Sequence, residues 1–210
     1  MKDAKTMCGI DVSHWQGLID WKKVKASGIQ FAIIKAGGSD AGFYKDKRFE
    51  RNYEKAKENG VFVGAYYFVG QHCISYADGV ADAKRFLKII EGKSFEYPLF
   101  IDIETTPTYK KQGATEAVIG FCDTLEKAGA YAGVYASDIG GFKDRLCIDR
   151  LRAYDKWVAR YGSKPKFVEK YGIWQVTSKA VVNGILGNVD YDESYLDYPA
   201  IMKRAGLNNF

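Results

Sequence analysis

Two carboxylates two positions apart end an apolar run in the middle of the chain, and their spacing suggests acid–base chemistry. The run is residues 97–106, YPLFIDIETT, in which Asp102 and Glu104 follow mostly apolar residues. Alternate side chains of a strand point to opposite faces, so Phe100, Asp102 and Glu104 share one face. Acids at the end of a buried strand cost free energy unless they are paired, hydrogen-bonded or neutralised. The placement favours chemistry over packing.

The elements that would position these acids alternate along the chain. Eight apolar, β-rich stretches predict strands, at 8–12, 29–36, 61–68, 97–104, 131–136, 155–159, 172–176 and 186–191. Helical patterns cover 20–25, a segment from Phe49 to a stop at Asn59-Gly60, 74–90, 114–128, 142–151 and 200–205. Alternation of this kind predicts an α/β fold, an irregular β/α (TIM-like) barrel with fewer helices than strands. An open doubly wound sheet is the structural alternative.

Length and composition fit one domain. The chain has 210 residues, 47% of them hydrophobic and 15% aromatic, enough for one sizeable core. We expect a single catalytic domain over 1–210, with its core at about 8–206 and no separate wall-binding domain. The net charge of +5 is mild and spread along the chain, which argues against nucleic-acid binding. It fits an anionic target such as a bacterial wall, or simply a solvated basic surface.

Several other classes of protein are disfavoured. The four cysteines show no metal-type spacing, and Cys122 lies in a helical apolar pattern typical of a core residue. Only His14 and His72 are present, and no nucleotide-binding or serine-hydrolase motif occurs, so we expect no metal and no cofactor. No segment approaches the length of a membrane span. The polar start, residues 1–6, lacks the apolar region of a signal peptide.

Polar and aromatic side chains fall at the ends of the predicted strands. In a β/α barrel the carboxyl ends of the strands form the active-site rim. Taken singly, strand-end acids are common turn and cap residues, but four carboxylates with aromatic neighbours exceed that expectation. The set comprises Asp11, Lys35, Tyr66, Tyr67, Asp102, Glu104, Tyr135, Gln175 and Asp190.

Carboxylates combined with aromatic rings suit sugar chemistry. A general acid must protonate the glycosidic oxygen, and burial beside another carboxylate raises its pKa for that purpose. Aromatic rings offer flat surfaces to the apolar faces of sugars. The pattern therefore predicts a glycoside-cleaving site at the rim.

The chain resembles the glycoside hydrolase family 25 lysozymes, N-acetylmuramidases found among phage endolysins and bacterial autolysins. The D-V-S-x-W-Q-G opening and the D-x-E strand are specific as a pair, and the matching segments occur in the family's order. These segments are GIDVSHWQG (9–17), IIKA (33–36), YKD (44–46), GAYYF (64–68), FIDIE (100–104), GVY (133–135), WVARY (157–161), WQ (174–175) and VD (189–190).

The resemblance implies cleavage of the β-1,4 bond between N-acetylmuramic acid and N-acetylglucosamine in peptidoglycan. Carried over, Glu104 is the general acid and Asp102 assists the second half of the reaction. Asp11 and Asp190 complete the acidic cluster, and Asp192 has a lesser role. The substrate-binding positions are Lys35, Tyr44, Tyr66, Tyr135 and Gln175.

Two positions depart from the family pattern. Gly37-Gly38-Ser39 stands where the family commonly has Thr-Glu-Gly, and Tyr67 replaces a histidine after Tyr66. The first change removes a polar group that could contact substrate, so it bears on the type of wall preferred. Both changes leave the four carboxylates in place, so we expect activity.

The D-x-E strand end suggests substrate assistance, in which the substrate's N-acetyl group attacks the anomeric carbon while Asp102 orients it and Glu104 donates the proton. The enzyme would act on the bacterial cell wall, released at phage lysis or secreted. Two alternatives come from other classes: a wall-binding module with an inactive barrel, and a hydrolase of another N-acetylated glycan such as chitin. The longer acidic motif usual in chitin hydrolases is missing before Asp102.

Overall fold

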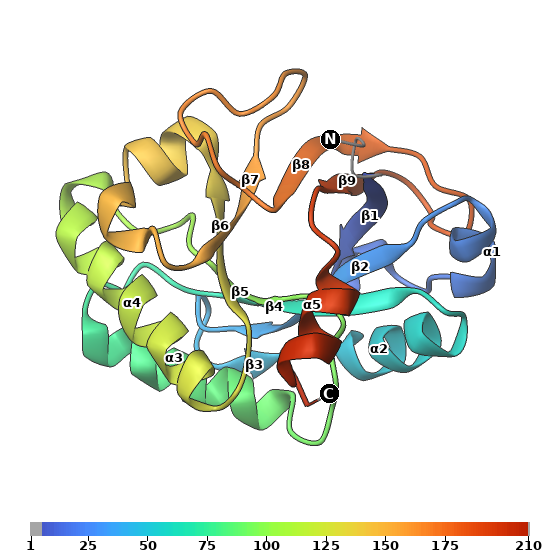
Figure 1. Ribbon diagram of the computed structural model, residues 1–210, viewed down its shortest axis with the longest axis horizontal. Coiled ribbons are helices and arrows are strands. Elements are labelled where there is room, and N and C mark those ends of the chain that lie inside the picture. Colours follow the sequence, from blue (N-terminus) through green and yellow to red (C-terminus); the bar gives the residue numbers. More distant parts are fainter. Residues whose placement is uncertain (1–5, 210) are drawn as a thin grey trace.

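The computed structural model describes residues 6–209, and eight strands of this part of the chain close into a barrel (Figure 1). The ring order is β1-β9-β8-β7-β6-β5-β4-β2, with β2 pairing back to β1, so the predicted barrel is confirmed. The polar start at residues 1–5 lies outside the described residues. The ring strands are β1 (Met7–Val12), β2 (Phe31–Gly38), β4 (Phe62–Phe68), β5 (Leu99–Asp102), β6 (Ala132–Ser137), β7 (Asp155–Ala159), β8 (Ile173–Ala180) and β9 (Val189–Ser194).

The last strand runs against its neighbours. Strand β9 is antiparallel to both β8 and β1, whereas the other ring pairs are parallel. The prediction that Asp190 ends its strand is therefore wrong, because Asp190 is the second residue of β9. Reversal of the strand still brings Asp190 to the carboxyl-end rim, where it pairs directly with Asp11.

Helices cover the outside of the barrel between strands. They are α1 (Trp21–Ala26), α2 (Phe49–Glu58), α3 (Tyr76–Ile89), α4 (Lys111–Lys127) and α5 (Tyr198–Ala205). The helix predicted over 142–151 is wrong: a π-helical turn, η3 (Asp138–Lys143), and a short 3-10 turn, η4 (Ile148–Leu151), occupy this region. Phe142 and Leu146 are buried as the pattern predicts. However, a Cβ on Gly141 would lie 2.5 Å from the Ala136 side chain, so this turn lies tightly against β6.

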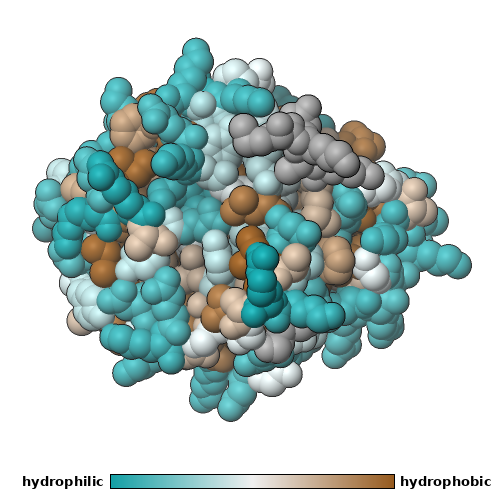
Figure 2. Space-filling view, viewed as in Figure 1, coloured by the Kyte–Doolittle hydropathy of each residue, from teal (hydrophilic) through white to brown (hydrophobic). Residues whose placement is uncertain are grey.

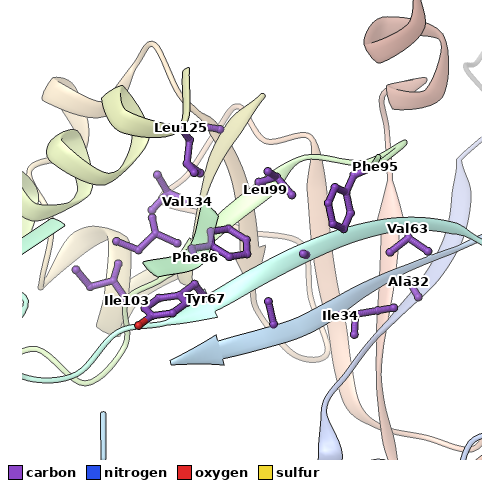
Figure 3. Packing of buried hydrophobic residues seen from close by; sticks show 14 of the residues in the cluster. Ala32, Ile34, Val63, Tyr67, Phe86, Phe95, Leu99, Ile103, Leu125 and Val134 are labelled. Carbon is purple, nitrogen blue, oxygen red and sulfur yellow. The ribbon is translucent and has the colours of Figure 1, made fainter. Parts of the chain in front are cut away.

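Alternation along the strands separates two apolar layers. On β5, Leu99 and Ile101 face outward into the main core beneath the helices, while Phe100 faces into the barrel. Figure 3 shows the outer layer, in which Tyr67 lies beside Phe86 between strand and helix. Cys122 on α4 belongs to the same layer and is fully buried, as predicted. The strand-face assignment made from sequence is confirmed for the residues of β5, whereas the prediction that this strand continues to Glu104 is wrong, because β5 ends at Asp102.

The end of the barrel opposite the rim is closed by α5, which lies across it in Figure 1. Tyr198 and Met202 of this helix are fully buried in the interior layer with Phe31 and Tyr97. Hydrophilic side chains dominate this face in Figure 2, and apolar ones occur in small separate groups. No helix within residues 6–209 is long and apolar enough to cross a membrane.

A buried carboxylate fixes the loop after β7. Asp138 accepts hydrogen bonds from the backbone N–H groups of Lys166 (2.8 Å), Phe167 (3.1 Å) and Val168 (3.0 Å), and from the Arg160 guanidinium (2.9 Å). Burial alone would raise the pKa of Asp138, but these hydrogen bonds outweigh burial and lower it. Asp138 thus stabilises the fold in its charged form.

We predict that Asp138→Asn lowers the free energy of unfolding at neutral pH by about 3 kcal/mol, because the guanidinium loses its buried partner. A carboxyl group with a lowered folded-state pKa contributes stability above its unfolded pKa and loses it as pH falls through the folded pKa. The difference between variant and wild type should therefore shrink on acidification, as measured by urea unfolding at about pH 7 and about pH 3. Asp149→Asn, at an exposed ion pair with Arg152, is the matched control and should change little. An equal loss at both pH values would contradict this role.

Candidate active site

A pocket of about 390 Å³ opens at the carboxyl-end rim of the barrel. It contains all four predicted carboxylates and four of the five predicted substrate-binding residues. Its lining comprises Asp11, Ser13, Trp15, Lys35, Asp40, Tyr66, Phe68, Asp102, Glu104, Tyr135, Trp157, Tyr161, Gln175 and Asp190. The chain thus brings acids from β1, β5 and β9 to one place.

A larger hollow of about 600 Å³ lies at the other end of the barrel, beside the amino-terminal ends of β6 and β7. Its acids are Asp155 and Glu169. Asp155 is already held by the Tyr198 hydroxyl and the Lys156 backbone N–H. The carboxylate cluster, and with it the candidate chemistry, belongs to the smaller pocket.

Asp102 and Glu104 differ in exposure although they are two residues apart. Asp102, the last residue of β5, is 4% exposed, and its Oδ1 atom is buried without a hydrogen-bond partner in the described structure. Burial and the charge of Glu104 raise its pKa well above the usual value, against the lowering effect of Lys35. Glu104 follows the strand and has a more exposed surface. Partial desolvation nevertheless raises its pKa, again opposed by Lys35.

Lys35 brings a positive charge to this acidic rim from the middle of β2. Its side chain is buried, and Nζ lies 4.3 Å from the ring centre of Phe68, 5.6 Å from that of Tyr44 and 6.0 Å from that of Tyr66. Aromatic faces stabilise a cation, so these rings hold the ammonium group beside the carboxylates. Lys35 therefore favours the ionised forms of Asp102 and Glu104.

Tyr44 is the predicted substrate-binding residue that does not line the pocket. It lies on β3 (Tyr44–Lys45), a two-residue strand that pairs with the end of β2, and its hydroxyl donates to Asp40 at 2.8 Å. A Cβ on Gly38 would lie 2.6 Å from the carbonyl oxygen of Phe68 and 2.7 Å from the Tyr44 hydroxyl. The glycine at this position therefore permits the close approach of β3, which places Tyr44 beside Lys35 and Asp40.

Gln175 links the acids to the tyrosines of the pocket. Its Nε2 atom donates to Asp11 Oδ2 at 2.7 Å, and its Oε1 atom accepts from the hydroxyls of Tyr135 (3.0 Å) and Tyr161 (3.1 Å). Because both tyrosines donate to one oxygen, the amide can present only its NH₂ group to Asp11. Gln175 thereby fixes the orientation of Asp11 at the floor of the pocket.

Several lining residues were not among the predicted site residues. Trp15 is 80% exposed at the pocket mouth, and Tyr161 and Trp157 reach the pocket from β7 and the residues after it. All three lie inside the sequence segments that resemble the family, and this resemblance could have identified them as site residues. No sequence pattern pointed to Asp40, because it lies in a loop after β2, where strand periodicity does not apply. The prediction that Tyr67 belongs to the rim is wrong, because its side chain lies in the outer core and does not line the pocket.

Comparison with known proteins assigns the family, because residues 10–185 match Glycosyl hydrolases family 25. The chain belongs to this family. It is 31% identical to the autolytic lysozyme of Clostridium acetobutylicum over 89% of this chain and 55% of the relative, so it spans about half of that protein. Among solved structures, it resembles the CTP1L endolysin at 28% identity and TM-score 0.81, covering 94% of this chain and 70% of the endolysin. The bacterial lysozyme of Streptomyces coelicolor gives 29% identity and TM-score 0.75, covering 91% and 93%.

We predict that Lys35→Met raises the pKa values of both Asp102 and Glu104, because the cation that lowers them is removed. Carboxyl ¹³C NMR titration measures both values directly. Lys45→Met removes the same charge from β3, where Lys45 pairs with Glu50, and should leave both titrations unchanged. Unshifted titrations in Lys35→Met would contradict the role assigned to this lysine.

Proposed function

We propose that this family 25 chain hydrolyses the β-1,4 bond between N-acetylmuramic acid and N-acetylglucosamine in bacterial peptidoglycan. The observation that carries the proposal is the pair formed by Asp102 and Glu104. Both carboxyl groups have raised pKa values, one group is buried and the other opens to the pocket. A raised pKa keeps Glu104 protonated closer to neutral pH, as a general acid requires, while Lys35 favours the ionised form in which Asp102 would act.

In the first half of the reaction, Glu104 gives its proton to the glycosidic oxygen as the bond from that oxygen to the anomeric carbon breaks. The carbonyl oxygen of the substrate's own N-acetyl group forms the new bond to the anomeric carbon, giving an oxazolinium ion. Asp102 accepts a hydrogen bond from the acetamido N–H and stabilises the positive charge. The buried Oδ1 atom of Asp102, which lacks a partner in the described structure, supports this role.

In the second half, water attacks the anomeric carbon, and the Glu104 carboxylate takes the proton from this water. The bond to the acetamido oxygen breaks, and the sugar keeps the configuration of the starting glycoside. Glu104 returns to its protonated form, so each turnover consumes one water. This sequence uses the same carboxyl group as acid and then as base.

The remaining lining residues suit a glycan strand. Tyr66, Tyr135 and Tyr161 offer rings and hydroxyls inside the pocket, and Trp15 extends an aromatic face at its mouth. The net charge of +5 favours approach to an anionic wall. We infer that the bacterial wall is the site of action, and peptidoglycan glycan strands are the proposed partner.

We predict that Glu104→Gln lowers the rate of wall lysis by at least about 100-fold, because the general acid is lost while the side-chain shape is kept. Turbidity loss of purified peptidoglycan measures the rate, and circular dichroism checks the fold. Glu126→Gln on α4 removes a carboxylate far along the outer helix and is the matched control. Near-normal lysis by Glu104→Gln would remove Glu104 as the acid. Wall binding without lysis by the wild-type protein would instead indicate a binding module.

Substrate assistance also predicts the stereochemistry. We expect the first-formed product to carry the β-anomer, because two displacements at the anomeric carbon restore its configuration. Proton NMR of a short soluble peptidoglycan fragment, recorded before mutarotation, identifies the anomer. An inverted product, or a trapped glycosyl ester on Asp102, would contradict assistance by the N-acetyl group.

A further inference from the structure

A buried acid lies beneath the floor of the pocket. Asp192 on β9 is fully buried and stands opposite Gly9 on β1 and Gln175 on β8. Its Oδ1 atom accepts a hydrogen bond from Trp157 Nε1 at 2.8 Å. No N–H group or hydroxyl of the described residues donates to its other oxygen, Oδ2. Burying a carboxylate with half of its acceptors unused is costly, so this oxygen calls for an explanation.

The carboxyl group of Asp11 lies on the same face of the neighbouring strand. Asp11 and Asp192 both point into the barrel from adjacent strands, as diagonal neighbours in the register that pairs Asp11 with Asp190. Each carboxyl group perturbs the other, and a proton carried by one of them would give the unpaired Oδ2 atom of Asp192 a hydrogen-bond partner in Asp11. Such a bond exists only when one of the groups carries a proton. Burial, together with the neighbouring charge of Asp190, raises both pKa values, that of Asp192 to about 8.

The other oxygen of Asp11 is occupied by Gln175. The Gln175 amide donates to Asp11 Oδ2 and is itself fixed by the two tyrosine hydroxyls on its oxygen. The Asp11 carboxyl group is therefore contacted from two sides, by the Gln175 amide on β8 and by the Asp192 carboxyl group on β9. The groups facing Asp11 are Asp190 on β9, Tyr66 on β4, Tyr135 on β6 and Tyr161 after β7. Two negative charges in this position would repel each other and the rest of the acidic rim.

We propose that Asp192 is a positioning residue that shares one proton with Asp11, so that the pair holds Asp11 at the pocket floor with a single negative charge. The role deepens the proposed glycoside hydrolysis and rests on it. An amide in place of Asp192 could still accept from Trp157 and donate to Asp11, whereas an aliphatic side chain could do neither. Replacement by an amide therefore tests whether Asp192 is needed as an acid, and replacement by an aliphatic side chain tests whether its hydrogen bonds are needed.

The experiment compares Asp192→Asn with Asp192→Leu. We expect Asp192→Asn to retain kcat, and Asp192→Leu to lose about 10- to 100-fold in kcat with a smaller change in KM, because Asp11 is no longer held in place. Circular dichroism and thermal unfolding check that each variant folds. Equal losses in both variants, or full activity in both, would overturn the positioning role.

A second measurement does not depend on activity. Carboxyl ¹³C NMR of the wild-type protein should show that Asp11 and Asp192 titrate as a coupled pair, retaining one proton well above the range of an isolated aspartate. In Asp192→Asn the pKa of Asp11 should fall, because the neighbouring acid is gone and an amide donor remains. An Asp11 titration in the ordinary aspartate range in the wild-type protein would overturn the shared proton, even if the protein proves to cleave peptidoglycan. A coupled pair in a protein that cleaves no glycan would instead reject the proposed function and leave the shared proton standing.

Discussion

Repulsion among crowded carboxyl groups is the constraint on which the rest of the pocket depends. Two unit charges 4 Å apart repel by about 4 kcal/mol at the effective dielectric constant typical near a protein surface, and more in a drier site. Asp11, Asp102, Glu104 and Asp190 line one cavity of about 390 Å³. The protein meets this repulsion with raised pKa values for all four groups and with the charge of Lys35. The raised pKa values let these groups keep their protons to a higher pH than an isolated carboxyl group would.

The barrel supplies a rigid base for this arrangement through Trp157. Its ring lies 4.3 Å from that of Tyr135, 5.3 Å from Phe100 and 5.9 Å from Tyr66, measured between ring centres. Its indole N–H also binds Asp192. One buried side chain on β7 therefore contacts residues from β4, β5, β6 and β9. Packing of this kind limits the movement of the acids above it.

Sequence patterns predicted the barrel and most of the pocket because strand periodicity fixes which side chains share a face. Asp102 and Phe100 illustrate this, since both point inward as alternation requires. Strand direction was beyond the pattern: Asp190 reaches the rim only because β9 is reversed, and periodicity is the same in both directions. Close contacts between distant segments could not be predicted from the sequence either. The turn at Gly141 and the approach of Tyr44 to Lys35 depend on backbone packing between distant segments.

The central claim is that the pocket cleaves after N-acetylmuramic acid, and the new reducing ends formed from one defined peptidoglycan test it most directly. Digestion, borohydride reduction and mass analysis of the released muropeptides identify the sugar at each new end. The account predicts reduced N-acetylmuramic acid. Reduced N-acetylglucosamine at the new ends, or release of chitin fragments with the peptidoglycan left intact, would contradict it.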